Sequence, residues 1–439
     1  MPDPAGPTAR AQDGTRADDP RPEPPDEQTP AASAPPAEPA PPGAETRASP
    51  ADGTSDPAPA PAPSAPEPAA APESVATPEP AATPEPPATP APTPTAARRR
   101  RRLRLARRAV LGVLLVLLVP VLAAQVALRI NYAGDPADGT YTRDRDALWL
   151  GHAWVDGRKK DADVTALARR LDGTGIRDLY VHSGPLEHDG TLPESAYPRA
   201  RWLIDAVHRE LPGVRVQAFL GDVLANGGPD GLHLDRAATR AEVVRSARQV
   251  LDAGYDGVHL DLEPLHSGDR DYLSLLDDLR AVTRAQDARL SVAAHQIDPL
   301  PELHSVVGLW ADHPKWWSQE FFGQVARRVD QIAVMSYDTA QPLEGTYGGY
   351  VALQTSLALE VTPPTTHLLM GLPFYYESNV SHWGHAETVA AAVRGARLGL
   401  SRTDPDRELF GVAPYIDFAA TETSWKEYRD GWLEPGADR

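Results

Sequence analysis

Residues 255–264 read Tyr-Asp-Gly-Val-His-Leu-Asp-Leu-Glu-Pro, and this stretch decides the fold. Its apolar side chains predict a short buried strand. His259, Asp261 and Glu263 are spaced two apart, so a strand points all three to the same face. Ionisable groups placed in this way cost desolvation energy unless they are paired or take part in chemistry. The stretch therefore predicts both a core strand and a candidate site.

The sequence on either side of this stretch alternates between two kinds of segment. Short apolar runs typical of strands occupy 147–155, 176–183, 214–221, 257–262, 290–295, 331–336, 367–374 and 409–416. Helical apolar spacing occupies 163–171, 200–211, 236–251, 272–285, 349–359 and 387–398. This alternation over 146–439 predicts a parallel (β/α)8 barrel of the TIM type. The alternative is a doubly wound open sheet, which is disfavoured because no Gly-x-Gly-x-x-Gly turn follows an early strand.

Barrel chemistry is found at the C-terminal ends of the strands. Polar or aromatic residues at the predicted strand ends are His152, Trp154, His182, Asp222, His295, Gln296, Tyr337, Asp338, Tyr375, Glu377, Tyr415 and Asp417. Strand ends meet water, so any one of these residues has an ordinary explanation. The acids of 255–264 taken together with Tyr337 and Asp338 favour a functional site.

The connection 298–329 is long for a barrel loop and is rich in aromatic residues. It carries Trp310, Trp316, Trp317, Phe321 and Phe322. Two interpretations stay open. Aromatic faces stack on sugar rings, and the same residues could also form a small core that packs the insertion against the barrel.

The N-terminal part has a different composition. Residues 1–97 hold 29 of the 47 prolines and almost no large apolar side chains, which predicts a disordered acidic tail. An Arg-rich segment, 98–108, precedes twenty uncharged residues, 109–128, a length that suits a membrane-spanning helix. A linker, 129–145, leads to the barrel.

The charge pattern predicts how this anchor is oriented. Arginines on the N-terminal side of 109–128 favour a cytoplasmic tail and an extracellular barrel, held by one pass through the cell membrane. A cleaved signal peptide, giving a secreted protein, is the alternative. A net charge of −18 argues against a nucleic-acid partner for the barrel. The chain has no cysteine, so an exported domain must depend on a large core.

Two motifs resemble those of family-18 glycoside hydrolases, the chitinase family. Asp256-x-x-His259-x-Asp261-x-Glu263 is similar to the Asp-x-x-Asp-x-Asp-x-Glu signature of the fourth barrel strand. Met335-Ser336-Tyr337-Asp338 is similar to the Met-x-Tyr-Asp motif of the sixth strand. The resemblance implies a barrel that cleaves N-acetylhexosamine-containing glycans by a substrate-assisted retaining mechanism. It implies no cofactor and no metal.

The resemblance also implies roles for individual residues. Glu263 is the expected general acid, Asp261 orients the substrate's 2-acetamido group, and Tyr337 donates a hydrogen bond to that group. Further predicted substrate contacts are Asp256, His259, Met335, Asp338, Tyr415 and Trp154; Tyr415 lies where the family usually has a tryptophan. Two carboxyls this close together cannot both ionise freely, so the pKa of one must rise.

His259 departs from the family pattern, which has Asp at this position. Either the imidazole donates a hydrogen bond to Asp261 and holds it as an anion, or the site has changed its sugar or lost its activity. The alternative function is therefore a non-catalytic carbohydrate-binding barrel. A metal-dependent hydrolase using His152, His182, His259 or His295 is disfavoured because no His-x-His or His-Glu-x-x-His spacing occurs.

Overall fold

The computed structural model describes residues 94–225, 228, 230–307 and 315–434. Its central feature is a sheet of eight parallel strands in the order β1-β2-β3-β4-β5-β8-β9-β10. These strands are β1 (Asp146–Leu150), β2 (Ile176–Pro185), β3 (Arg215–Val223), β4 (Gly257–Glu263), β5 (Arg289–Ala294), β8 (Gln331–Val334), β9 (His367–Pro373) and β10 (Phe410–Tyr415). All eight predicted strands are confirmed.

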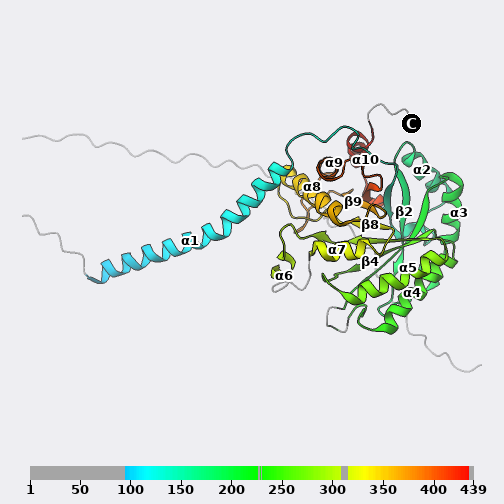
Figure 1. The fold of residues 1–439 in the computed structure, drawn as a ribbon, viewed down its shortest axis with the longest axis horizontal. Coiled ribbons are helices and arrows are strands. Elements are labelled where there is room, and N and C mark those ends of the chain that lie inside the picture. Colours follow the sequence, from blue (N-terminus) through cyan, green and yellow to red (C-terminus); the bar gives the residue numbers. More distant parts are fainter. Residues whose placement is uncertain (1–93, 226–227, 229, 308–314, 435–439) are drawn as a thin grey trace, which may run out of the picture. The chain divides into compact units, whose positions relative to one another are not determined.

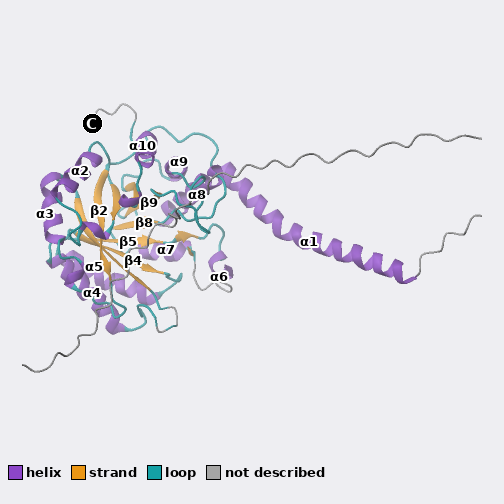
Figure 2. Ribbon diagram, turned by 180° about the vertical axis from the view of Figure 1, so that it is seen from behind, coloured by secondary structure: helices purple, strands orange, loops and turns teal. Residues whose placement is uncertain are grey.

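A helix follows each strand of this sheet. These helices are α2 (Asp161–Leu171), α3 (Ala200–Glu210), α4 (Ala237–Asp252), α5 (Arg270–Ala285), α7 (Gln319–Ala326), α8 (Glu344–Val361), α9 (Val389–Thr403) and α10 (Glu422–Trp432). Figures 1 and 2 show the strands at the centre with the helices outside them. The arrangement is that of a (β/α)8 barrel, as the alternation of segments predicted.

The first and last strands lie next to each other, so the sheet is nearly closed. The backbone N–H of Val412 in β10 donates to the carboxylate of Asp146 in β1 over 2.9 Å. The same carboxylate accepts hydrogen bonds from Thr142, Tyr428 and Trp432 at 2.8–3.0 Å. Asp146 thereby ties the first strand to the C-terminal helix α10.

The interior of the barrel is built in layers, because residues two apart on a strand share a face but lie roughly 6.5 Å apart along its axis. His259 lies within an aromatic layer, stacked on Tyr180 at a centroid distance of 3.8 Å. Trp149 and Phe219 contact the same imidazole edge-on. Asp261 and Glu263 are one and two steps further along β4 and reach the end of the barrel.

Shorter elements lie in the connections. They are η1 (His152–Trp154), η2 (Glu194–Ala196), β6 (Gln296–Ile297), α6 (Leu303–Val307), β7 (Trp316–Trp317) and η3 (Asp417–Ala419). In the long insertion, Trp317, Phe321 and Phe322 are buried and in mutual contact, which fits the small-core interpretation. Trp316 donates to the Tyr350 hydroxyl over 2.7 Å. Trp310 lies outside the described residues.

Helix α1 (Pro94–Asn131) contains the predicted membrane segment. Its part Arg101–Asn131 is long and apolar enough to cross a bilayer, with a mean hydropathy of 2.7 over its most apolar window. Length and composition alone support this, so the membrane anchor stays a prediction. The predicted tail, 1–97, lies outside the described residues except for its last four positions.

Candidate active site

A cavity of about 580 Å³ opens at the C-terminal ends of the barrel strands. The lining residues used below are Trp149, Asp261, Glu263, His295, Lys315, Met335, Tyr337, Asp338, Ser381 and Tyr415. A larger hollow of about 700 Å³ is lined by helix-to-strand loops such as 171–174 and 210–212, so it lies at the opposite end of the barrel. The predicted catalytic acids line the first cavity, which makes it the candidate site.

Asp261 and Glu263 reach the cavity because they are the last two inward-facing residues of β4. The Oδ1 atom of Asp261 is buried and has no hydrogen-bond partner among the described residues. Burial, and to a smaller extent the charge of Glu263, raises the pKa of Asp261 well above its usual range. Partial burial and the charge of Asp338 also raise the pKa of Glu263. A proton is therefore retained on these acids at higher pH than on ordinary carboxyls.

Tyr337 and Tyr415 form an aromatic wall beside the acids. Their rings are stacked with centroids 5.2 Å apart, and Trp149 meets Tyr415 edge-on at 5.5 Å. Tyr337 is nearly fully buried, whereas Tyr415 is partly exposed to the cavity. A flat aromatic surface next to carboxyl groups suits a sugar ring, which has an apolar C–H face and polar hydroxyls.

Asp338, the residue after Tyr337, also lines the cavity. Its backbone has a φ of 55°, and its side chain is 45% exposed. The Tyr375 hydroxyl donates to Asp338 Oδ1 over 2.8 Å. The ammonium group of Lys315 donates to the Asp338 carbonyl over 2.7 Å. The carboxylate is thus held in a fixed position with part of its surface free for a ligand.

His295 lines the cavity close to Glu263. Its Nε2 atom is 3.6 Å from Glu263 Oε1 and accepts a hydrogen bond from the backbone N–H of Leu265 over 3.3 Å. Burial lowers the pKa of His295 to about 4. The imidazole is therefore neutral at pH 7 and forms no ion pair with Glu263.

The predicted hydrogen bond from His259 to Asp261 is wrong. Trp149 Nε1 donates to His259 Nε2 over 3.1 Å, so Nδ1 carries the proton and donates to the Ser291 hydroxyl over 2.6 Å. Burial lowers the pKa of His259 to about 3, which keeps the ring neutral. Both ring nitrogens are occupied one layer below the cavity, and His259 does not line it.

Two other predicted substrate contacts lie away from the cavity. Asp256 precedes β4 at the opposite end of the barrel, where it accepts hydrogen bonds from the Val216 N–H (2.7 Å) and from His208 (2.8 Å). Trp154 belongs to η1 because β1 ends at Leu150, earlier than predicted. Its indole N–H donates to Asp417 over 2.7 Å. These contacts account for both side chains without a substrate.

The remaining predicted site residues lie together. Glu263, Asp261, Tyr337, Asp338, Met335 and Tyr415 all line the cavity, and their roles stay predictions. Sequence reasoning missed Trp149 and Lys315. Trp149 was detectable as the last aromatic residue of its strand once the strand end was placed correctly. Lys315 comes from an insertion, and nothing in its local sequence indicates where it lies.

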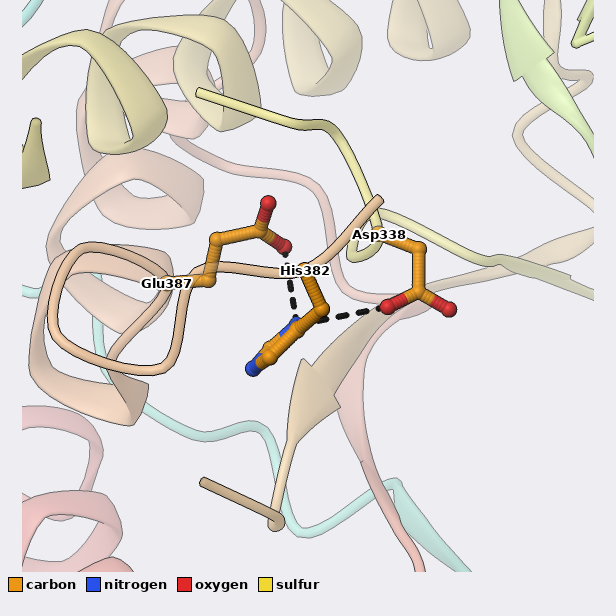
Figure 3. A group of neighbouring side chains, drawn as sticks. All are labelled: Asp338, His382 and Glu387. Carbon is orange, nitrogen blue, oxygen red and sulfur yellow. Dashed lines mark ion pairs between the residues drawn. The ribbon is translucent and has the colours of Figure 1, made fainter. Parts of the chain in front are cut away.

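Only one group of three His, Asp or Glu residues in the described part of the chain brings its donor atoms within 4.8 Å of one another. It consists of Asp338, His382 and Glu387 (Figure 3). Such a group could share one cation, and a protonated imidazole would itself supply a positive charge between the two carboxylates. None of the four histidines considered for a metal-dependent hydrolase belongs to this group.

No protein-family model and no curated protein matches the sequence. Solved structures similar to the chain include the spore cortex-lytic enzyme SleL of Bacillus cereus, at 13% identity and a TM-score of 0.47, covering 66% of this chain and 74% of that one. A chitinase from Chromobacterium violaceum is 13% identical with a TM-score of 0.47, covering 66% and 99%. The Group IV chitinase of Ostrinia furnacalis is 17% identical with a TM-score of 0.37, covering 52% and 66%.

These proteins are chitinases and a cortex-lytic enzyme, in keeping with the chitinase-like resemblance of the two motifs.

Proposed function

We propose that residues 146–439 form a chitinase-like glycoside hydrolase that cleaves β-glycosidic bonds in an N-acetylhexosamine-containing glycan. The observation that carries the proposal is the position of Asp261 and Glu263 at the open end of the barrel, next to an aromatic wall. One buried oxygen of Asp261 has no hydrogen-bond partner among the described residues, although buried polar atoms in folded proteins are nearly always hydrogen-bonded. A substrate group would supply the missing partner.

The proposed reaction begins with proton transfer from Glu263 to the glycosidic oxygen. The carbonyl oxygen of the substrate's own 2-acetamido group attacks the anomeric carbon while the bond to the leaving group breaks. Asp261 and Tyr337 orient the acetamido group. Water then attacks the anomeric carbon from the face opposite the acetamido oxygen, and the bond between that oxygen and the anomeric carbon breaks. The attacking water gives a proton to the Glu263 carboxylate, and the configuration is retained.

The electrostatics of the cavity favour Glu263 as the acid. A general acid must hold its proton near the working pH, and partial burial together with the nearby Asp338 charge raises the pKa of Glu263. Asp261 is buried more deeply, and its pKa is raised well above the usual range. Because the charge of Glu263 raises the pKa of Asp261, the two carboxyls lose their protons in linked steps.

The test is hydrolysis of a fluorogenic chito-oligosaccharide by the purified full-length chain and by Glu263→Gln. Glutamine keeps the size of the side chain but has no acidic proton, so we expect the rate to fall by about 10²–10⁴-fold. Glu377→Gln is the matched control, because Glu377 is an exposed carboxyl on the segment after β9. Each reaction is run with and without a chelator, and the chelator is expected to have no effect.

Three results would count against the proposal. Equal rates for the parent and Glu263→Gln would exclude Glu263 as the acid. Binding of the oligosaccharide without hydrolysis by the parent would favour a non-catalytic carbohydrate-binding barrel. Loss of activity with the chelator would favour a metal-dependent hydrolase.

We further propose that α1 anchors the barrel on the outer side of the cell membrane. The apolar part of α1 and the arginines before it support this orientation. Protease added to intact cells should remove the barrel and leave the N-terminal tail intact. Protection of the barrel would contradict the orientation, and recovery of a processed barrel from the medium would favour a cleaved signal peptide.

A further inference from the structure

The group Asp338, His382 and Glu387 joins the candidate site to the connection between β9 and α9 (Figure 3). Asp338 lines the cavity, whereas His382 and Glu387 do not. Both are fully buried in the connection between β9 and α9. His382 Nδ1 lies 3.3 Å from Asp338 Oδ1 and 3.3 Å from Glu387 Oε2. The imidazole thus lies between two carboxylates, of which only one faces the cavity.

Glu387 is itself held in place. Its Oε1 atom accepts hydrogen bonds from the backbone N–H and the hydroxyl of Thr339, both at 2.9 Å. Its Oε2 atom makes no hydrogen bond among the described residues and points toward His382. Thr339 directly follows Asp338, so Glu387 binds the same turn of chain that carries the cavity carboxylate.

His382 is also fixed, from its own loop. The side-chain oxygen of Asn379 accepts hydrogen bonds from the backbone N–H groups of Ser381 (2.8 Å) and His382 (2.9 Å). The carbonyl of Ser381 accepts a hydrogen bond from the N–H of Ala340 over 2.7 Å. The imidazole also contacts the ring of Tyr375 at a centroid distance of 4.4 Å, and the Tyr375 hydroxyl donates to Asp338.

We propose that His382, supported by Glu387, is a positioning residue that holds the Asp338 carboxylate oriented toward the substrate. A buried carboxylate is costly unless an opposite charge compensates it. An imidazolium shared by Asp338 and Glu387 supplies that charge. Because neither His382 nor Glu387 lines the cavity, both act through Asp338. The kinetic effects expected of His382 rest on the proposed function, whereas the positive charge expected on His382 does not.

The surrounding charges favour this assignment. Burial acts to lower the pKa of His382, but its contacts with Asp338 and Glu387 outweigh burial and raise the pKa to about 9. The other titratable groups facing the cluster are five tyrosines, Lys315 and Glu263. The tyrosines are Tyr337, Tyr347, Tyr350, Tyr375 and Tyr415, and burial raises the pKa of each, so they stay neutral. Lys315 already places one ammonium group against the Asp338 carbonyl, which disfavours an additional divalent cation.

Asp338 links this group to the proposed general acid, Glu263. Its negative charge contributes to the raised pKa of Glu263. Without the imidazolium, Asp338 and Glu387 would be like charges with no cation between them, so the Asp338 side chain would turn away and contact substrate less well. The loss of a positive charge beside Asp338 would also raise the pKa of Glu263 further.

The first test measures the charge of His382 without any activity. Hydrogen–deuterium exchange at histidine C2, followed by mass spectrometry of the full chain, reports the titration of each histidine. We expect His382 to remain protonated well above pH 7 and Glu387→Gln to move its titration to lower pH. Titration of the parent's His382 below pH 7, or no change in Glu387→Gln, would overturn the proposal.

The second test is kinetic and compares His382→Gln with His385→Gln, the same substitution at an exposed position of the same loop. His382→Gln should raise KM about tenfold, the cost of removing the charge that pairs with the Asp338 carboxylate. The alkaline limb of its pH–rate profile should move to higher pH, by up to about one unit. Unchanged KM and profile relative to His385→Gln would overturn the proposal. If His382→Gln does not fold, Glu387→Gln serves in its place, with a smaller change in the same direction expected.

Elemental analysis of the purified chain separates this proposal from a metal site, because an imidazole with two carboxylates is also a set that binds zinc. Less than stoichiometric metal in the parent is expected. A stoichiometric metal ion that is lost in His382→Gln would overturn the positioning role. A failed Glu263→Gln test would leave the exchange measurement valid, so the two proposals can fail separately.

Discussion

Asp146 and Asp261 are both carboxyls of barrel strands, Asp146 fully buried and Asp261 half-buried, and their surroundings differ. Asp146 begins β1 and accepts hydrogen bonds from Thr142, Val412, Tyr428 and Trp432. Asp261, near the end of β4, has one buried oxygen to which no residue in the described part of the chain donates a hydrogen bond. Burial raises the pKa of both, to about 6 for Asp146. The raised pKa is therefore common to both acids. The hydrogen bonds that each carboxylate accepts are what distinguishes the structural acid from the catalytic one.

The largest effect is expected from Asp261→Asn. If the unpaired oxygen is kept for a substrate group, asparagine should lower the hydrolysis rate by about 100-fold or more. The free energy of unfolding should stay the same or rise, because the substitution removes a buried ionisable group that no described residue stabilises. Initial rates and urea unfolding measure the two quantities. If Asp261→Asn kept its activity but lost stability, Asp261 would be a structural acid, as Asp146 is.

Asp146→Asn should do the opposite. Asparagine turns one acceptor oxygen into an NH2 group that faces existing donors, so we expect the free energy of unfolding to fall by about 2–3 kcal/mol. The hydrolysis rate per folded molecule should not change, since Asp146 lies at the other end of the barrel from the cavity. The measurement is urea unfolding, with active-site titration to count folded molecules. A large loss of rate at full stability would make Asp146 functional.

Much of the fold was predictable from sequence, because a parallel barrel strand is buried on both faces and reads as a continuous apolar run. The six cavity residues Asp261, Glu263, Met335, Tyr337, Asp338 and Tyr415 could be grouped because parallel strands end on the same side of the barrel. The strand period identifies which residues share a face. It does not identify how far along the barrel each one lies.

This limit explains the residues that were misplaced or missed. His259 shares its face with Asp261 but lies one layer deeper, and Asp256 lies at the opposite end of the barrel. Trp154 was assigned to a strand that ends four residues earlier, at Leu150. His382 and Glu387 come from a connection whose path depends on tertiary contacts with the turn after β8. No local pattern encodes such contacts.

The smallest expected effect concerns His259, which lies on the same strand as Asp261 but has both ring nitrogens hydrogen-bonded. Its pKa is lowered from 6.5 to about 3 in the folded chain. Between these values the unfolded chain binds a proton that the folded chain does not. The stabilising effect of a neutral His259 is therefore complete above pH 6.5 and is lost as the pH falls toward 3.

His259→Gln removes this titration while offering one acceptor and one donor to the same neighbours. Between pH 4 and 6 we expect the free energy of unfolding of this variant to change less steeply with pH than that of the parent. The two slopes should differ by about 1.4 kcal/mol per pH unit. His385→Gln, in an exposed loop, should keep the parent's slope. The pH–rate profile of His259→Gln should match that of the parent, because His259 does not contact Asp261. A shifted pH–rate profile, with an unchanged pH dependence of the free energy of unfolding, would mean that the imidazole acts on the catalytic acids. The contrast on β4 between a fully hydrogen-bonded His259 and an Asp261 kept for substrate would then be wrong.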